Sequence, residues 1–215
     1  MKIRNGSKLV FIGDSVTDCG RKQPVGEGLF GPYGAGYVNV VAGHLGAVAP
    51  GANIRVVNMG TSGNTVRDLK ARWQTDVFDQ KPTWLSIMIG VNDVWRQFDS
   101  PLETETHVLP GEYEETLDEL VRTTQPTVEG LVLMTPHYLE PNPADSMRAR
   151  MDEYGAIVKR IAAKYNTLLV DTQAAFECVL ANTHSTYIAW DRVHPNIIGH
   201  TVLARAFLSA VDALN

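Results

Sequence analysis

Short apolar runs alternate along the chain with longer segments in which apolar residues recur at the spacing of one helix face. Each run is rich in β-branched or other apolar residues and is apolar enough to be buried on both faces of a sheet. The pattern predicts five strands, at residues 8–12, 54–58, 84–89, 130–135 and 167–170. Buried strands that alternate with helices are typical of a parallel sheet covered on both faces, so we expect an α/β fold.

The segments between the strands predict helices at residues 36–48, 65–78, 111–124, 147–165 and 197–214. Two polar segments that contain proline, 96–110 and 138–146, are expected to be surface loops next to strand ends. Charged residues between Arg67 and Trp73 fall on one side of a predicted helix, which indicates a solvated face or a subunit contact. Because neither a repeat nor a linker interrupts the pattern, residues 1–215 are expected to form a single domain.

The composition narrows the possible classes of function. A chain of 215 residues that is 44% hydrophobic can bury a full core, and a net charge of -5 leaves no basic patch for nucleic acid. The apolar run at 9–12 is too short for the core of a signal peptide, and no run is long enough to cross a bilayer. The two cysteines, Cys19 and Cys178, are too few for a disulfide framework. We therefore expect a cytoplasmic protein that binds neither nucleic acid nor a membrane.

Candidate chemistry begins directly after the first predicted strand, at Gly13-Asp14-Ser15. The carboxyl ends of parallel strands form the crevice in which open α/β sheets bind ligands, so a serine there is both exposed and held by a rigid backbone. A nucleophile needs both properties. The alternative is that Asp14 and Ser15 merely cap a turn or the start of a helix, and the tripeptide alone does not separate the two readings.

A serine hydroxyl needs a base that removes its proton, and that base needs an acceptor that fixes its tautomer. Asp191 and His194 lie three residues apart on a predicted loop, so the carboxylate can accept from one ring nitrogen while the other faces Ser15. Pro195 disfavours helical backbone at His194 and keeps it extended on this loop. An isolated pair of this kind is more often an ordinary loop before a helix that starts at Asn196. The pair therefore indicates a catalytic site only when a candidate nucleophile is present as well.

Acyl transfer also requires donors aimed at the oxyanion that develops on the carbonyl. After the second predicted strand, Gly63 lies in a loop where glycine lets the backbone amide approach a ligand closely. After the third strand, the side-chain amide of Asn92 can donate and Asp93 can brace the loop. Each segment alone is also an ordinary turn, but all of these segments follow strands of the same sheet. Together they predict a serine hydrolase.

These segments resemble, in the same order, the four conserved blocks of the SGNH (Gly-Asp-Ser-type) hydrolases; they are Gly13-Asp14-Ser15, Gly63, Gly90-Val91-Asn92-Asp93 and Asp191-Arg192-Val193-His194. The resemblance implies Ser15 as nucleophile, Asp191 and His194 as the other catalytic residues, and an oxyanion hole formed by the Ser15 and Gly63 amides with the Asn92 side chain. It also implies a three-layer α/β/α sandwich of flavodoxin-like strand order. Val16 replaces the leucine of the family motif, which should affect packing behind the serine more than chemistry.

The longer stretches from Gly63, Asn92 and Ala189 are similar to those of bacterial acetyl-xylooligosaccharide esterases. That resemblance implies removal of acetyl groups from short xylan fragments inside the cell, by an enzyme that forms homo-oligomers. We expect the substrate-binding residues to be Asp14, Trp95, His137, Tyr138 and Trp190. Asp14 is expected to brace the nucleophile turn as well. The two tryptophans offer flat faces that suit sugar rings as well as they suit a core.

No cofactor is required by this chemistry, and the remaining histidines lack carboxylate or cysteine neighbours at metal-ligand spacing, so no metal site is predicted. Two alternatives stay open. The same residues would serve an esterase, thioesterase or lysophospholipase that acts on another acyl ester, which chain-length preference would separate. A flavodoxin-like module that only binds a small anion is the other alternative, but such a module has no need for Ser15 with an Asp191 and His194 pair.

Overall fold

The computed structural model describes residues 1–214, and its centre is a five-stranded sheet in which all strands are parallel. The strand order is β2-β1-β3-β4-β5, which is the flavodoxin-like order. The strands are β1 (Lys8–Gly13), β2 (Arg55–Asn58), β3 (Trp84–Met88), β4 (Gly130–Met134) and β5 (Leu168–Val170). The predicted α/β class and all five predicted strands are thus confirmed, with ends that differ by at most one residue.

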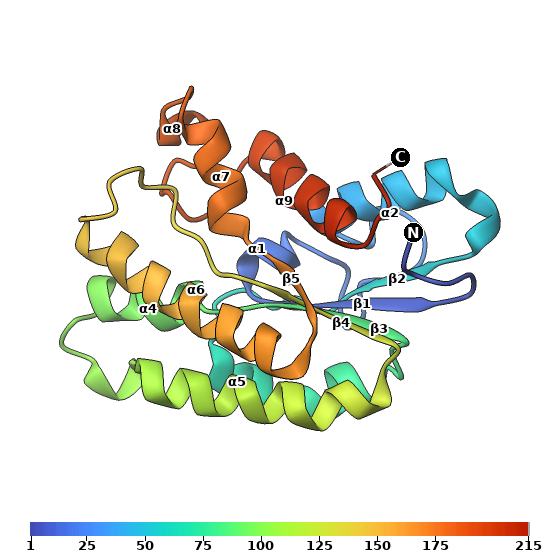
Figure 1. The fold of residues 1–215 in the computed structure, drawn as a ribbon, viewed down its shortest axis with the longest axis horizontal. Coiled ribbons are helices and arrows are strands. Elements are labelled where there is room, and N and C mark those ends of the chain that lie inside the picture. The colour runs from blue at the N-terminus through green and yellow to red at the C-terminus, as the bar shows by residue number, and fades with distance from the viewer. Residues whose placement is uncertain (215) are drawn as a thin grey trace.

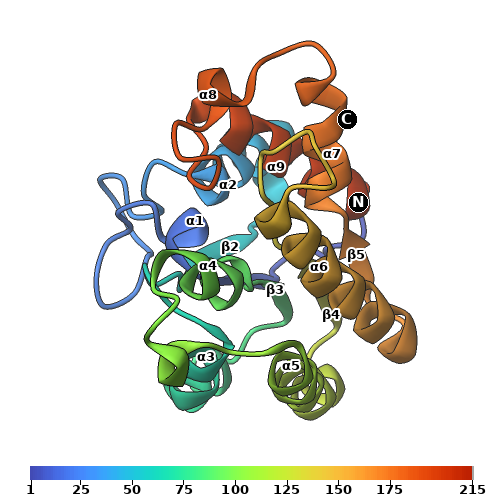
Figure 2. The ribbon, with the colours of Figure 1, turned by 90° about the vertical axis from the view of Figure 1, so that its left-hand side faces the viewer.

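Helices cover both faces of the sheet, as Figure 1 and the view from the side in Figure 2 show. The helices are α1 (Ser15–Asp18), α2 (Tyr37–Val48), α3 (Val66–Ala71), α4 (Val91–Asp99), α5 (Pro110–Thr124), α6 (Ser146–Tyr165), α7 (Thr172–Leu180), α8 (Ser185–Ile188) and α9 (Ile197–Ala210). The three-layer sandwich that the resemblance implied is therefore present. Short 3-10 turns at Pro50–Ala52, Thr104–Thr106 and Gln125–Thr127 and a π-helical turn at Gln74–Phe78 complete the elements.

Alternate residues of the strands enter two separate cores. Along β1, Val10 and Ile12 pack with α3, α4, α5 and α6, whereas Leu9 and Phe11 pack with α2, α7 and α9. This alternation follows from the two-residue period of a strand, and it explains why each run is apolar throughout. The two termini lie together at one end of the sheet (Figure 1), where the Lys2 amide donates to the Val211 carbonyl at 2.8 Å.

The predicted helices need three corrections. The segment 65–78 is not one helix, because α3 ends at Ala71 and a π-helical turn follows. The last helix ends at Ala210 rather than at residue 214. The segment 96–110 is not loop throughout, because α4 continues to Asp99.

Four helices were not predicted at all, namely α1, α4, α7 and α8. They have four or nine residues each, and one or two turns give too few apolar positions for a periodic signal. Within residues 1–214, no helix combines the length and the apolar character that crossing a membrane would need.

Two glycines let the elements around the strand ends approach one another. A Cβ added to Gly13 at the end of β1 would lie 2.3 Å from the Met88 carbonyl oxygen of β3. A Cβ on Gly60, just after β2, would lie 2.3 Å from the Asp18 amide nitrogen of α1. Both distances are far below van der Waals contact, so only glycine permits this packing.

Candidate active site

Ser15 is the first residue of α1, directly beyond the end of β1. The preceding Asp14 caps this helix, because its Oδ1 accepts from the Val16 amide at 3.0 Å. Ser15 itself is partly exposed, and its Oγ lies 2.7 Å from Nε2 of His194. The serine is thus held at the start of a helix with its hydroxyl directed at an imidazole.

Asp14 is buried, which disagrees with the expectation that it contacts substrate, whereas its bracing of the turn agrees with the cap that it forms. Burial raises the pKa of Asp14 to about 7, although the Val16 amide and the nearby His194 and Arg72 oppose the shift. Asp18 braces the same turn from its other end, since its Oδ2 accepts from the Ser62 amide at 3.0 Å.

Asp191 holds His194 through both of its oxygens. Oδ1 accepts from the backbone amides of Val193 at 2.9 Å and of His194 at 2.8 Å, and Oδ2 lies 2.5 Å from His194 Nδ1. Partial burial works to raise the pKa of Asp191, but these hydrogen bonds outweigh it and hold the pKa below its ordinary value. An ionised carboxylate only accepts, so Nδ1 carries the proton and Nε2 is left to accept from the Ser15 hydroxyl.

Besides the Ser15 amide, the predicted oxyanion donors lie on the loop after β2 and in the first turn of α4. Gly63 adopts a φ of +82°, which a residue with a side chain rarely adopts, and no heavy atom lies within 4 Å of the place where its Cβ would be. Asn92 lies in the first turn of α4 and is buried, and its Nδ2 donates to the Asn64 carbonyl at 2.9 Å. One of its two amide hydrogens is thereby engaged, and the other remains for a ligand.

Asp93 braces this region, as its place after Asn92 predicted. Its Oδ1 accepts from the Val66 amide at 2.9 Å, which joins the amino-terminal ends of α3 and α4. Its Oδ2 is buried without a hydrogen-bond partner, and burial raises the pKa of Asp93 to about 7.

The aromatic candidates for substrate binding have different environments. The Trp95 ring centre lies 5.7 Å from that of His194, so this residue lies at the catalytic histidine. Trp190 is 87% exposed, which excludes the alternative that it belongs to a core. Tyr138 is partly buried and packs against the core beneath α6.

His137 is buried, which disagrees with the expectation that it is a pocket residue. It is 2% exposed, and its ring packs against Phe176 with 4.7 Å between ring centres. Burial lowers the pKa of His137 to about 3, although the Val193 backbone opposes this shift. A strand-end position does not reveal such burial, because the elements that cover the ring come from distant parts of the chain.

One residue of the site was missed. The segment between Arg67 and Trp73 was expected to be a solvated face, and Arg67 and Lys70 do form exposed ion pairs with Glu112 and Glu119. Arg72 instead turns inward and donates to atoms at the end of β1 and in the loop after β2. No signal in the sequence set it apart, because Asp68 and Asp76, four residues before and after it, are ordinary i,i+4 partners for a solvated arginine.

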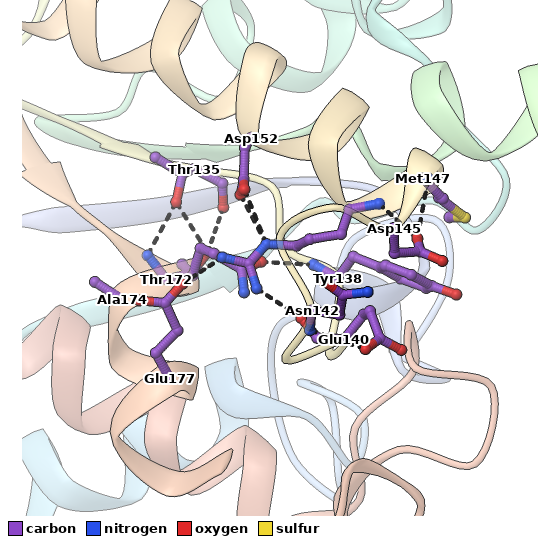
Figure 3. Close-up of polar contacts among 12 residues, drawn as sticks. Thr135, Tyr138, Glu140, Asn142, Asp145, Met147, Asp152, Thr172, Ala174 and Glu177 are labelled. Carbon is purple, nitrogen blue, oxygen red and sulfur yellow. Dashed lines mark hydrogen bonds and ion pairs between the residues drawn. The ribbon is translucent and has the colours of Figure 1, made fainter. Parts of the chain in front are cut away.

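A cavity of about 250 Å³ lies between α6 and α7 and contains none of Ser15, Asp191 and His194. Arg148 is buried beside it, pairs with Asp152 and Glu177, and donates to the Glu140 carbonyl at 2.6 Å. Figure 3 shows Asp152, Glu177 and Glu140 around this centre, with Thr135 and Thr172 joined nearby. The charged groups of Arg148, Asp152 and Glu177 pair with one another, so this cavity differs in kind from the Ser15 site.

Within residues 1–214, no three His, Cys, Asp or Glu side chains converge in a way that could hold a metal ion. The site therefore offers a hydroxyl, an imidazole and a carboxylate in series, next to a loop glycine and a side-chain amide. This is the arrangement that acyl transfer through a serine requires.

The chain is similar over nearly its whole length to an acetylxylan esterase. The chain is 60% identical over 211 residues to the acetylxylan esterase of Geobacillus stearothermophilus, covering 98% of this chain and 96% of that one. The crystal structure of that enzyme, Axe2, superimposes with a TM-score of 0.97 at 60% identity and the same coverage. The structure of LAE5, described as an alpha/beta hydrolase enzyme from the metagenome of Lake Arreo in Spain, gives a TM-score of 0.99 at 56% identity, covering 100% of this chain and 99% of that one.

The sequence profile of the GDSL-like Lipase/Acylhydrolase family matches residues 11–202, which include every element that carries the site. Both the family resemblance and the ester-hydrolase class predicted from the motifs are therefore confirmed. On the sequence, the fold and the full-length similarity, this chain belongs to the GDSL-like Lipase/Acylhydrolase family.

Proposed function

We propose that this esterase removes acetyl groups from xylo-oligosaccharides through an acetyl-enzyme intermediate on Ser15. The observation that carries the proposal is the relay of two contacts, from Ser15 Oγ to His194 Nε2 at 2.7 Å and from His194 Nδ1 to Asp191 Oδ2 at 2.5 Å. A hydroxyl in such a relay gains a base without any metal or cofactor.

In the first half of the reaction, His194 takes the Ser15 proton as Oγ attacks the acetyl carbonyl carbon. The electron pair of the C=O bond moves to the oxygen, and the Ser15 and Gly63 amides with the Asn92 side chain are proposed to stabilise that charge. The C=O bond then re-forms as the ester C–O bond breaks, and His194 gives its proton to the departing sugar oxygen.

In the second half, water takes the place of the sugar hydroxyl. His194 removes a proton from water, the hydroxide attacks the acetyl-serine carbonyl, and the proton returns to Ser15 Oγ as acetate leaves. Asp191 stays ionised throughout and stabilises the imidazolium that forms twice in each cycle, which its low pKa favours.

The similar proteins support the substrate class. The relative that covers nearly the whole chain is named an acetylxylan esterase, and structures of that enzyme are described as an acetyl-xylooligosaccharide esterase. Three further structures of it, S15A, D191A and H194A, are each described as catalytic mutants. On this chain, Trp95 beside His194 and the exposed Trp190 offer faces on which a sugar ring stacks.

Acetate release from acetylated xylo-oligosaccharides by the native enzyme and by Ser15→Ala tests the substrate, with a long-chain ester run alongside. Ser15-dependent release from the sugar ester supports the proposal. Release only from the long-chain ester would show that the substrate is a lipid ester and not an acetylated sugar. Absence of Ser15-dependent release from both would favour a module that binds without reacting.

The enzyme is also proposed to form a homo-oligomer, as the resemblance to acetyl-xylooligosaccharide esterases implies. Phe30 is 98% exposed and Leu29 is 74% exposed, and a second copy of the chain would bury such large apolar groups. Sedimentation of the purified enzyme at micromolar concentration tests this, and a mass equal to one chain overturns it.

A cytoplasmic location is proposed as well. The two cysteines of the described residues, Cys19 and Cys178, are unpaired, which fits a reducing compartment. Fractionation of the producing cells with an antibody to the enzyme tests the location, and recovery from the medium would contradict it.

A further inference from the structure

Arg72 joins two segments that meet at the candidate active site. Its Nη2 donates to the Gly13 carbonyl at 2.9 Å, its Nη1 to the Met59 carbonyl at 2.7 Å, and its Nε to Asn64 Oδ1 at 2.6 Å. The first acceptor ends the strand before Ser15, and the other two lie in the segment 59–64 that contains Gly63. We call this segment the oxyanion loop.

The contact with Asn64 continues to the third predicted oxyanion donor. The Asn64 carbonyl accepts from Asn92 Nδ2 at 2.9 Å, so the direction of the remaining Asn92 amide hydrogen depends on where Asn64 lies. Arg72 fixes the side chain of Asn64 while Asn92 binds its backbone. A chain of two hydrogen bonds therefore runs from the guanidinium to the amide that faces the developing oxyanion.

The position of Arg72 is itself fixed. Its Nη1 also donates to Asp76 Oδ2 at 2.6 Å, and its side chain is only 16% exposed. A guanidinium presents several donors in one rigid plane, which is why one side chain satisfies acceptors both at the end of β1 and in the oxyanion loop. A lysine ammonium in its place would reach only part of this set.

We infer that Arg72 is a positioning residue for the oxyanion hole, which it sets by tying the oxyanion loop to the end of β1 and, through Asn64, to Asn92. The inference rests on the proposed hydrolysis at Ser15. A positioning role differs from a purely structural role in one respect. Loss of Arg72 should slow formation of the tetrahedral state more than it weakens binding of substrate.

The test compares Arg72→Met, Arg72→Lys and Asn64→Ala with the native enzyme, using p-nitrophenyl acetate and measuring kcat, KM and the melting temperature. Arg72→Met should lower kcat by about 100-fold with KM changed by less than about threefold, as loss of an oxyanion donor does. The kcat of Arg72→Lys should lie between that of Arg72→Met and that of the native enzyme. Asn64→Ala leaves the core intact because Asn64 is partly exposed. It therefore tests the hydrogen-bonded link from Arg72 through Asn64 to Asn92 even where an Arg72 variant folds poorly.

Arg148 supplies the matched control, because it is also a buried arginine that donates to a backbone carbonyl, but at the cavity between α6 and α7. Arg148→Met should lower the melting temperature while kcat stays within about twofold of native, since it touches no residue of the oxyanion loop. Equal losses of kcat in both arginine variants would show that general destabilisation explains the effect and would overturn the inference.

The double variant Arg72→Met with Asn64→Ala decides whether the effect passes through Asn64. If it does, kcat of the double variant should lie within about twofold of Arg72→Met alone, whereas multiplied losses would contradict the link. The rate at which diethyl p-nitrophenyl phosphate phosphorylates Ser15 gives a second reading, because negative charge also grows on the phosphoryl oxygen in the oxyanion hole as Oγ bonds to phosphorus and p-nitrophenolate leaves. Slower labelling in Arg72→Met supports the inference, and unchanged labelling overturns it.

Failure of the proposed function gives a different result. If Ser15→Ala hydrolyses the ester as fast as the native enzyme, the proposed function and the inference fall together. If hydrolysis depends on Ser15 but not on Arg72, only the inference falls.

Discussion

At the scale of single residues, the site depends on one aspartate that performs two tasks. Asp191 Oδ1 binds the amides of Val193 and His194 and so shapes the turn, while Oδ2 fixes the tautomer of the His194 ring. Both tasks are local, because the residues lie within four positions of one another. This is why the Asp-x-x-His spacing, taken together with a candidate nucleophile, could predict the pair.

Asp191→Asn separates the two tasks. The amide oxygen still accepts from the backbone, but its NH₂ group faces Nδ1 and favours the tautomer in which Nε2 is protonated and cannot act as base. We expect kcat to fall by about 10⁴-fold with little change in melting temperature, measured by ester hydrolysis and thermal unfolding. A variant that keeps more than about a tenth of native kcat would contradict this role for Asp191.

Residues whose environment comes from distant segments could not be predicted in the same way. His137 and Asp14 were expected to face substrate, yet both are buried by elements that the local sequence does not reveal. Arg72 was read with its charged neighbours as part of a solvated face, but its acceptors lie up to 59 positions away. A sequence pattern gives the type of side chain, whereas tertiary packing decides its direction.

At the scale of elements, the site depends on the close approach of α1 to the loop after β2. Gly60 makes this approach possible, since a Cβ there would meet the Asp18 amide nitrogen at 2.3 Å and the Thr17 carbonyl carbon at 2.7 Å. Both of those atoms are backbone, so the neighbour cannot rotate away. The strands themselves were predicted well because burial on both faces leaves continuous apolar runs, whereas α1 and α8 are single turns without such a signal.

Gly60→Ala is therefore expected to push α1 away from the oxyanion loop. The free energy of unfolding should fall by about 1–3 kcal/mol, and kcat should fall as Ser15 moves from His194. Gly43→Ala in α2 is the control, because no heavy atom lies within 4 Å of its added Cβ. That change should stabilise the enzyme by about 0.5–1 kcal/mol, and a Gly60→Ala enzyme with native stability and kcat would refute the packing argument.

At the scale of the whole molecule, buried ionisable groups of opposite kind make stability depend on pH in opposite directions. Burial raises the pKa of Asp14 and Asp93 to about 7, and it lowers the pKa of His137 to about 3 and of His200 to about 4. The folded state loses the stability that the two protonated carboxyls contribute as pH rises from their ordinary pKa of 3.8 to about 7, because the carboxyls of the unfolded chain ionise first. The folded state loses the stability that the two neutral imidazoles contribute as pH falls below their ordinary pKa of 6.5, because the imidazoles of the unfolded chain take up protons first.

Asp93→Asn isolates one of these contributions. The amide oxygen keeps the bond from Val66 but does not ionise, so the variant escapes the cost that native Asp93 incurs above its ordinary pKa. The melting temperature of the variant minus that of the native enzyme should increase by several degrees from about pH 5 to about pH 8. Asp99→Asn, on the exposed side of the same helix, should show no such trend, and a flat difference for Asp93→Asn would contradict the assigned burial cost.

The central claim is that Ser15 carries the acetyl group during turnover. The most direct measurement quenches the reaction with acid within milliseconds of mixing enzyme and p-nitrophenyl acetate and locates the label by mass spectrometry of proteolytic fragments. The account predicts one added acetyl group, on Ser15, that is absent from Ser15→Ala and from enzyme quenched after substrate is exhausted. Turnover without an acetyl group on Ser15, or with the group on another residue, would contradict it.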